Sequence, residues 1–355
     1  MLTITKTNVR RFTGTAGAMV LATAVALPVT LDTALAHHPS ATTSRGGGGG
    51  GGIVTENAET LTAGERVMSI AHEYIDLNRL SDDTLIDAAS QGRDVHSLGK
   101  IQGGTIGFFY GLTNFITIGA VLPWISRSEI FEGEEDDGEF EVEKLGTAEG
   151  IGDVTLTTQV RVYKNPVSGQ TVALVGGVKL PTGSTGDKDL EGNSFGAEFQ
   201  PGSGSVDYRL GGAFRQPMGP FNFDSSVLYI FVQEGTQDVD LGDRFLYNAA
   251  LSFRVLGETG DHHQGADAAG HSHAHGPTLD LVIELNGEWS DKEIDGGIVD
   301  PDTGGSTLYV SPGVRLGSDG LAGFISVGVP VSKDFNGTQS QPDWRIMSGV
   351  SLALP

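Results

Sequence analysis

Most of the histidines in this sequence fall into two clusters that could bind a metal ion. The run from Asp261 to Gly276 contains five of the nine, His262, His263, His271, His273 and His275, and a further pair, His37 and His38, lies near the N-terminus. The His-x-His spacing lets neighbouring imidazoles meet one divalent cation such as Zn²⁺, Ni²⁺, Cu²⁺ or Co²⁺. We therefore expect a divalent-metal site here, with a low-complexity polar insertion as the alternative interpretation. No other cofactor is expected.

A second set of candidates consists of charged side chains that alternate with apolar ones. In residues 152–163 the apolar side chains share one face of an extended chain, and Thr, Gln and Arg side chains share the other. The same alternation recurs toward the C-terminus and places nine charged residues on polar faces: Arg161, Lys179, Asp207, Arg209, Arg254, Asp280, Glu284, Arg315 and Arg345. These residues could line a pore and set its selectivity, or form salt bridges that brace a plugged barrel.

The elements that must position these charges are strands about ten residues long. We expect about 12 antiparallel strands, an even number as in bacterial single-chain barrels. Their approximate spans are 65–77, 98–110, 115–126, 151–163, 170–180, 203–214, 221–233, 243–256, 278–290, 305–317, 321–332 and 341–354. Short turns alternate with longer loops, which fits a barrel with periplasmic turns and external loops.

Two of the longer connections carry specific expectations. Residues 78–97 should contain a short helix capped by Ser81, and residues 127–150 should form an acidic loop. The connection 257–277 is long although it falls on the periplasmic side, and it contains the larger histidine cluster.

The fold class that these strands favour is a transmembrane antiparallel β-barrel. After residue 36 no run of about 20 apolar residues could form a spanning helix, and only helices and closed barrels satisfy all backbone polar groups in hydrocarbon. A lipocalin-like soluble barrel of eight strands would give the same alternation. Aromatic residues near strand ends favour the membrane barrel because they suit interfacial girdles: Trp124, Tyr163, Tyr229, Phe231, Trp289 and Trp344.

The N-terminal residues are typical of a secretory signal. Basic residues precede an apolar stretch over residues 16–29, and Ala34-Leu35-Ala36 forms a small-x-small cleavage site. We therefore divide the chain into a signal peptide (1–36), a His/Gly-rich linker (37–60) and a barrel (61–355). The expected location is the outer membrane of a Gram-negative bacterium.

Composition narrows the function classes. The chain has no cysteine and a formal net charge of −23, which argues against nucleic acid because phosphates need clustered Lys and Arg. An enzyme is not expected, since His72 is the only histidine on a predicted strand and no Gly-x-Ser-x-Gly motif occurs. The expected partners are outer-membrane lipids, lipopolysaccharide, a small-molecule solute and a periplasmic protein.

Several short motifs resemble one family of exported barrels. They are His37-His38-Pro39, Ile53-Val54-Thr55, Glu73-Tyr74-Ile75-Asp76, Gly152-Asp153-Val154, Lys179-Leu180-Pro181-Thr182-Gly183 and Gln200-Pro201-Gly202-Ser203-Gly204. Together they are similar to the transporter-like outer-membrane proteins named for the meta-pathway of phenol degradation, over roughly residues 53–354. The resemblance implies an outer-membrane channel for small molecules, including aromatic or hydrophobic ones, and supplies no catalytic residues.

These observations predict an outer-membrane channel or transporter for small solutes. Two alternatives stay open at this point. One is a barrel linked to divalent metals through its histidine-rich periplasmic segments, and the other is a structural barrel with a plugged lumen.

Overall fold

The computed structural model describes residues 51–257, 276–318 and 320–355. The expected signal peptide, the pair His37 and His38, and all five histidines of the 257–277 connection lie outside these ranges. The metal site predicted from those seven histidines therefore stays a prediction.

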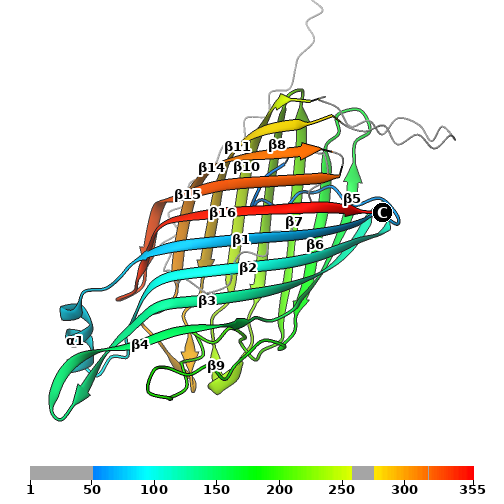
Figure 1. The fold of residues 1–355 in the computed structure, drawn as a ribbon. Coiled ribbons are helices and arrows are strands. Elements are labelled where there is room, and N and C mark those ends of the chain that lie inside the picture. The colour runs from blue at the N-terminus through cyan, green and yellow to red at the C-terminus, as the bar shows by residue number, and fades with distance from the viewer. Residues whose placement is uncertain (1–50, 258–275, 319) are drawn as a thin grey trace, which may run out of the picture. The chain divides into compact units, whose positions relative to one another are not determined.

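Twelve strands form one closed antiparallel barrel, as the alternation predicts. They are β1 (Arg66–Asn78), β2 (His96–Thr113), β3 (Ile116–Asp136), β5 (Thr155–Lys164), β6 (Thr171–Lys179), β7 (Asp207–Met218), β8 (Phe221–Phe231), β10 (Arg244–Leu256), β11 (Thr278–Ser290), β14 (Gly305–Ser318), β15 (Leu321–Phe335) and β16 (Gln341–Leu354). Each pairs with its neighbours in chain order, and β1 closes the barrel against β16 with Arg66 opposite Leu354. Figure 1 shows these long strands wrapped around one lumen.

An apolar belt surrounds the barrel, because every one of the twelve strands presents at least one exposed large apolar side chain. One from each strand, in chain order, is Ile70, Ile106, Leu122, Leu156, Leu174, Leu210, Val227, Leu251, Ile283, Leu316, Ile325 and Val350. A continuous belt of this kind is what a lipid-facing wall requires. Among the described residues, none of the helices is long and apolar enough to cross a membrane.

Aromatic side chains border this belt toward one end of the barrel. The rings of Tyr74 and Trp344 are 5.2 Å apart, and Trp124 is likewise partly exposed on the neighbouring wall. We call these three residues the outer aromatic group. They mark the level at which the wall leaves the hydrocarbon, because aromatic girdles sit at membrane interfaces.

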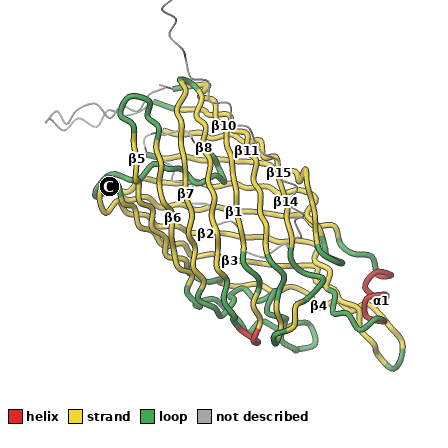
Figure 2. The backbone as a smooth tube through the Cα atoms, turned by 180° about the vertical axis from the view of Figure 1, so that it is seen from behind, coloured by secondary structure: helices red, strands yellow, loops and turns green. Residues whose placement is uncertain are grey.

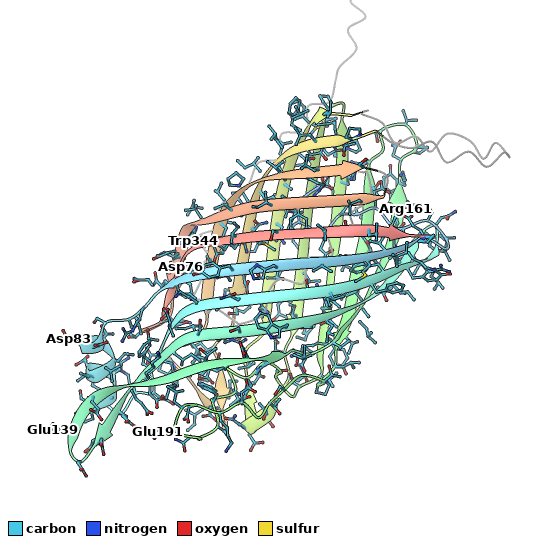
Figure 3. All side chains as sticks on the ribbon, in the orientation of Figure 1. Asp76, Asp83, Glu139, Arg161, Glu191 and Trp344 are labelled. Carbon is cyan, nitrogen blue, oxygen red and sulfur yellow. The ribbon has the colours of Figure 1, made fainter. Side chains whose placement is uncertain are left out.

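The two ends of the barrel differ. The helix α1 (Asp82–Ser90), strand β4 (Glu139–Ile151) and the short strand β9 (Val239–Asp240) gather at one end, and the C-terminus lies at the other (Figures 1 and 2). We call the first end the outer mouth and the second the inner rim. Figure 3 shows acidic side chains at the outer mouth, among them Asp83, Glu139 and Glu191, whereas Arg161 lies near the inner rim.

The outer mouth contains the main departure from the predicted strands. The loop prediction for residues 127–150 was wrong, since β3 continues to Asp136 and pairs with β4 in a hairpin. Its turn is Asp137-Gly138. Both residues have positive φ (51° and 86°), as a two-residue hairpin turn of type I′ requires. The high charge of this segment indicated a loop, although a hairpin that projects beyond the barrel can hold its charges in water.

The rest of the outer mouth contains the helix predicted from sequence and several short elements. The expected helix is α1, and the Ser81 side chain accepts a hydrogen bond from the Thr84 backbone N–H. The short strands β12 (Ile294–Asp295) and β13 (Ile298–Val299) pair with each other, and β12 also pairs with β9. A 3₁₀ turn (Thr236–Asp238) precedes β9.

Candidate functional site: the occupied lumen

Residues 51–61 lie inside the barrel, and we call them the luminal segment. Its first residues lie beside β11 and β14, and its last residues lie at the inner rim, where β1 begins. The linker prediction for 37–60 was therefore wrong over 51–60. Its physical reason is the apolar content after the glycine run, because Ile53, Ala58 and Leu61 are each at most 6% exposed.

Glu284 holds the first part of the luminal segment. This residue of β11 is 1% exposed, and one carboxylate oxygen accepts hydrogen bonds from the backbone N–H groups of Ile53 (2.9 Å) and Thr55 (3.0 Å). The other oxygen accepts one from the Val54 N–H (3.0 Å), and the Thr55 hydroxyl donates to the carboxylate as well (2.8 Å). A buried carboxylate with this many donors is a strong anchor, since hydrogen bonds to charged groups are the stronger ones.

Side chains from several strands hold the middle of the segment. Arg315 of β14 donates to the Gly52 carbonyl, and Arg209 of β7 lies 3.8 Å from the Glu56 carboxylate. Beyond them, Ala58 is fully buried in an apolar cluster made by inward residues of β6, β7 and β8: Ala173, Val175, Ala213 and Leu228. Polar anchors and apolar packing thus alternate along the segment.

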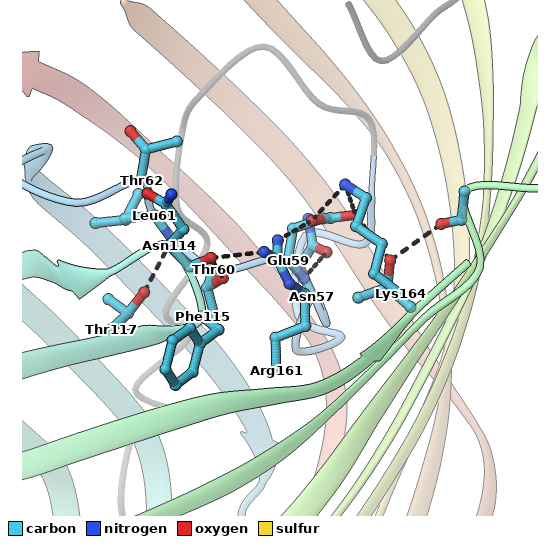
Figure 4. Close-up of polar contacts among 12 residues, drawn as sticks. Asn57, Glu59, Thr60, Leu61, Thr62, Asn114, Phe115, Thr117, Arg161 and Lys164 are labelled. Atoms are coloured by element: carbon cyan, nitrogen blue, oxygen red, sulfur yellow. Dashed lines mark hydrogen bonds and ion pairs between the residues drawn. The ribbon is translucent and has the colours of Figure 1, made fainter. Parts of the chain in front are cut away.

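Glu59 forms the last anchor near the inner rim (Figure 4). Its carboxylate lies 3.3 Å from the Arg161 guanidinium and 3.1 Å from the Lys164 amine, and it accepts a hydrogen bond from the Thr171 hydroxyl (2.9 Å). Two residues later the Leu61 N–H donates to the Thr117 hydroxyl on β3 (2.9 Å). The segment is therefore fixed at both of its ends.

The structure places all nine charged candidates on the lumen side, and four of them contact the luminal segment directly: Arg161, Arg209, Glu284 and Arg315. The other five pair within the wall. Lys179 pairs with Asp207, and Arg254 pairs with Asp280. Arg345 donates to Asn286 (2.9 Å), and its guanidinium lies 4.1 Å from the centre of the Tyr309 ring.

A second segment fills the lumen near the outer mouth. The connection from β6 to β7, residues 180–206, is called the mouth segment here. Its residues Phe195 and Phe199 are almost fully buried in an apolar cluster formed with inward side chains of β1 to β4: Leu77, Leu98, Ile101, Ile130, Leu145 and Ala148. The buried Arg127 donates to the carbonyls of Phe199 (3.0 Å) and Gln200 (3.1 Å), which fixes the mouth segment to β3.

Beside the luminal segment a small cavity of about 50 Å³ persists. It is lined by both polar and apolar groups, including Val54, Leu228, Asn286 and Tyr309. A cavity of this size accommodates a few water molecules. The luminal segment and the mouth segment thus each fill part of the lumen.

Sequence reasoning found the wall charges but missed their partners. Glu56 and Glu59 were assigned to a linker, although each faces an arginine predicted to point inward. The available signal was the apolar set Ile53, Val54 and Ala58 directly after the glycine run. A linker exposed to water is not expected to carry these apolar side chains.

Comparison with known proteins gives one family and a set of related folds. A family model described as "Putative MetA-pathway of phenol degradation" matches residues 90–316. The crystal structure of an outer membrane channel from Pseudomonas putida F1 is similar, with a TM-score of 0.55 and 15% identity over 84% of this chain and 98% of that chain. No curated protein matches the sequence.

Two further structures show weaker similarity. LpxR from Salmonella typhimurium has a TM-score of 0.39 and 11% identity over 80% of this chain and 99% of that chain. A Pseudomonas aeruginosa FadL homologue has a TM-score of 0.36 and 8% identity over 81% and 89%. The Pseudomonas putida structure supports the barrel fold alone, and the two weaker similarities support no conclusion.

Proposed function

Because the chain belongs to the family described as "Putative MetA-pathway of phenol degradation", we propose that it is an outer-membrane channel for small solutes, closed at rest by its luminal segment. The observation that carries this proposal is the luminal segment itself. A barrel of twelve strands can enclose a passage, and here the passage is filled by a segment whose C-terminal end continues into β1 at the inner rim. A segment attached in this way can leave the lumen without unfolding the wall.

The anchors of the luminal segment are suited to reversible release. They are hydrogen bonds and ion pairs to a carboxylate and to arginines, and water can replace each of them once the segment moves out. The apolar packing of the segment involves four side chains, those of Ile53, Val54, Ala58 and Leu61. The purely structural, permanently plugged barrel is the alternative, and the experiments below distinguish the two.

We propose small aromatic or hydrophobic molecules as the solute class. Phe195 and Phe199 pack with β1 to β4 in a buried apolar cluster at the outer mouth, which a solute would meet only when the mouth segment moves and which favours an apolar solute. The family description refers to phenol degradation, and a similar structure is described as an outer membrane channel. The family description favours aromatic compounds as the solute, and the similar structure favours a channel.

The experiment that tests the channel is single-channel recording in planar bilayers. The full mature barrel should be silent or open rarely, and a chain lacking residues 51–60 should give stable current steps. A folded but silent deletion chain would support the plugged structural barrel and contradict the proposal. Refolding of each chain is checked by its resistance to unfolding in unheated SDS.

The solute class is tested on the conducting deletion chain. A neutral aromatic such as phenol should reduce the ionic current at millimolar concentration, whereas a neutral sugar should not. Replacing Phe199→Ser should weaken the effect of phenol because it removes part of the apolar cluster that phenol would contact. Equal effects of the two solutes would contradict an aromatic path while leaving the channel itself intact.

A further inference from the structure

Several carboxylates surround a single histidine at the outer mouth. His96 begins β2 and pairs in register with Glu132 of β3. Glu132 lies eight residues beyond Trp124 of the outer aromatic group, which corresponds to about 26 Å along an extended strand. The site is therefore outside the membrane, at the end of the barrel opposite Leu256 and Thr278, where β10 ends and β11 begins.

The two imidazole nitrogens of His96 face different carboxylates. Nε2 lies 2.9 Å from Glu132 Oε2 and 3.6 Å from Asp94 Oδ1, while Nδ1 lies 3.5 Å from Glu198 Oε1. One ligand atom from each of Asp94, His96 and Glu132 lies within 4.8 Å of the other two. These three groups are thus close enough to meet one ion on the Nε2 side of the ring.

A buried carboxylate without a hydrogen-bonding partner adjoins this group. Glu293 is 9% exposed and lines a cavity of about 150 Å³ together with Asp94, His96 and Glu198. None of the described residues donates a hydrogen bond to its side chain, although its own backbone N–H donates to Thr303 (2.9 Å). A buried carboxylate in that position normally has a donor or a cation beside it.

The charges of this cavity favour a cation. Burial works against the imidazolium, but the hydrogen bond to Glu132 and the charges of Glu198 and Asp94 outweigh it and raise the pKa of His96 to about 9. Burial and the neighbouring charge of Glu198 also raise the pKa of Glu293. Four carboxylates, those of Asp94, Glu132, Glu198 and Glu293, thus lie at or beside this cavity.

We propose that Asp94, His96 and Glu132 form a binding site for one divalent transition-metal ion. The Nε2 atom would be the nitrogen ligand, and the two carboxylates would supply oxygen ligands, a donor set that suits Zn²⁺. Glu198 would accept the hydrogen bond from Nδ1–H and so fix the tautomer that leaves Nε2 free to bind the ion. The bound ion takes the place of the Nε2 proton, which is released to solvent.

This site would also join separate parts of the outer mouth. His96 belongs to β2 and Glu132 to β3, whereas Glu198 lies in the mouth segment and Glu293 in the connection between β11 and β12. An ion bound by the first two residues, with Glu198 held by the imidazole, would therefore stabilise the mouth segment in its position over the lumen.

The test uses the full mature chain with its other clustered histidines replaced by Asn, so that only His72 and His96 are kept. The replaced residues are His37, His38, His262, His263, His271, His273 and His275. Zn²⁺ alone is titrated into this refolded barrel in detergent, and binding is followed by calorimetry. We expect one bound ion per chain. Absence of binding to the folded barrel would overturn the proposal.

Single substitutions in that background assign the ligands. His96→Asn and Asp94→Asn should each weaken Zn²⁺ binding at least tenfold, and Glu198→Gln should weaken it by about 10–100-fold as an outer-shell partner. Asp94 is 84% exposed, so its replacement does not endanger folding. The matched control is His72→Asn on the exposed outer wall, which should bind as the parent does. Unchanged binding in both His96→Asn and Asp94→Asn would refute the site.

Discussion

Replacement of Glu284 by Ala should release the luminal segment. The carboxylate accepts hydrogen bonds from the backbone N–H groups of Ile53, Val54 and Thr55, and all three groups are buried. Leaving a buried donor unpaired costs about 1–3 kcal/mol. We take the low end for each of the three, because water from the lumen can reach the vacated space. The total of about 3 kcal/mol raises the open population roughly a hundredfold.

The assay uses the fact that the chain has no cysteine. A single Ala58→Cys places a thiol where the native side chain is fully buried, and a small hydrophilic maleimide reports how often the segment opens. Val167→Cys, at a position that is 94% exposed, gives the reference rate for an open thiol. Labelling at position 58 should be slow in the parent and about a hundred times faster with Glu284→Ala.

The matched control is Glu288→Ala, four residues further along the same strand. Glu288 pairs with Arg244 of the wall and has no hydrogen bond to the luminal segment. Its loss should therefore change labelling at position 58 far less than the loss of Glu284 does. Labelling of the folded Glu284→Ala barrel within twofold of the parent, or equal acceleration by Glu288→Ala, would refute the anchor role.

Three further predictions concern other contacts. Arg161→Ala removes a partner of Glu59 and should cost about 1 kcal/mol, which speeds labelling at position 58 roughly fivefold. Arg127→Met leaves two carbonyls of the mouth segment without their donor and should cost about 2 kcal/mol, so trypsin should cleave at the exposed Lys188 roughly thirty times faster. The raised pKa of His96 stabilises the fold fully below its ordinary value of 6.5, and this contribution is lost as pH rises to about 9. Urea unfolding should then show a loss of roughly 3 kcal/mol between pH 6 and pH 10 that His96→Asn lacks.

The wall of the barrel could be predicted from sequence because its pattern is local. In a strand with one lipid-facing and one luminal face, apolar and polar side chains alternate strictly. About ten residues of sequence are therefore enough to predict each strand. The nine charged candidates followed from the same register. The hairpin of β3 and β4 was missed because it stands above the membrane, where both faces are wet and the apolar alternation ends.

The interior could not be predicted in the same way because it is assembled from distant residues. Glu284 meets Ile53 across 231 positions, and no periodicity connects a luminal segment to the wall that surrounds it. His96, Glu198 and Glu293 likewise come from three separate connections or strand ends. Only the barrel closure brings them to one place, so their spacing along the chain could not show that they meet.

We propose that departure of the luminal segment, residues 51–61, opens a conducting path through the barrel. The most direct measurement is the single-channel current through the chain lacking residues 51–60, recorded before and after adding a synthetic peptide of residues 51–61. The current should be present without the peptide and should fall when the peptide is added. A peptide of the same composition in scrambled order should leave it unchanged. Absence of current in the folded deletion chain, or a current that neither peptide alters, would contradict this account.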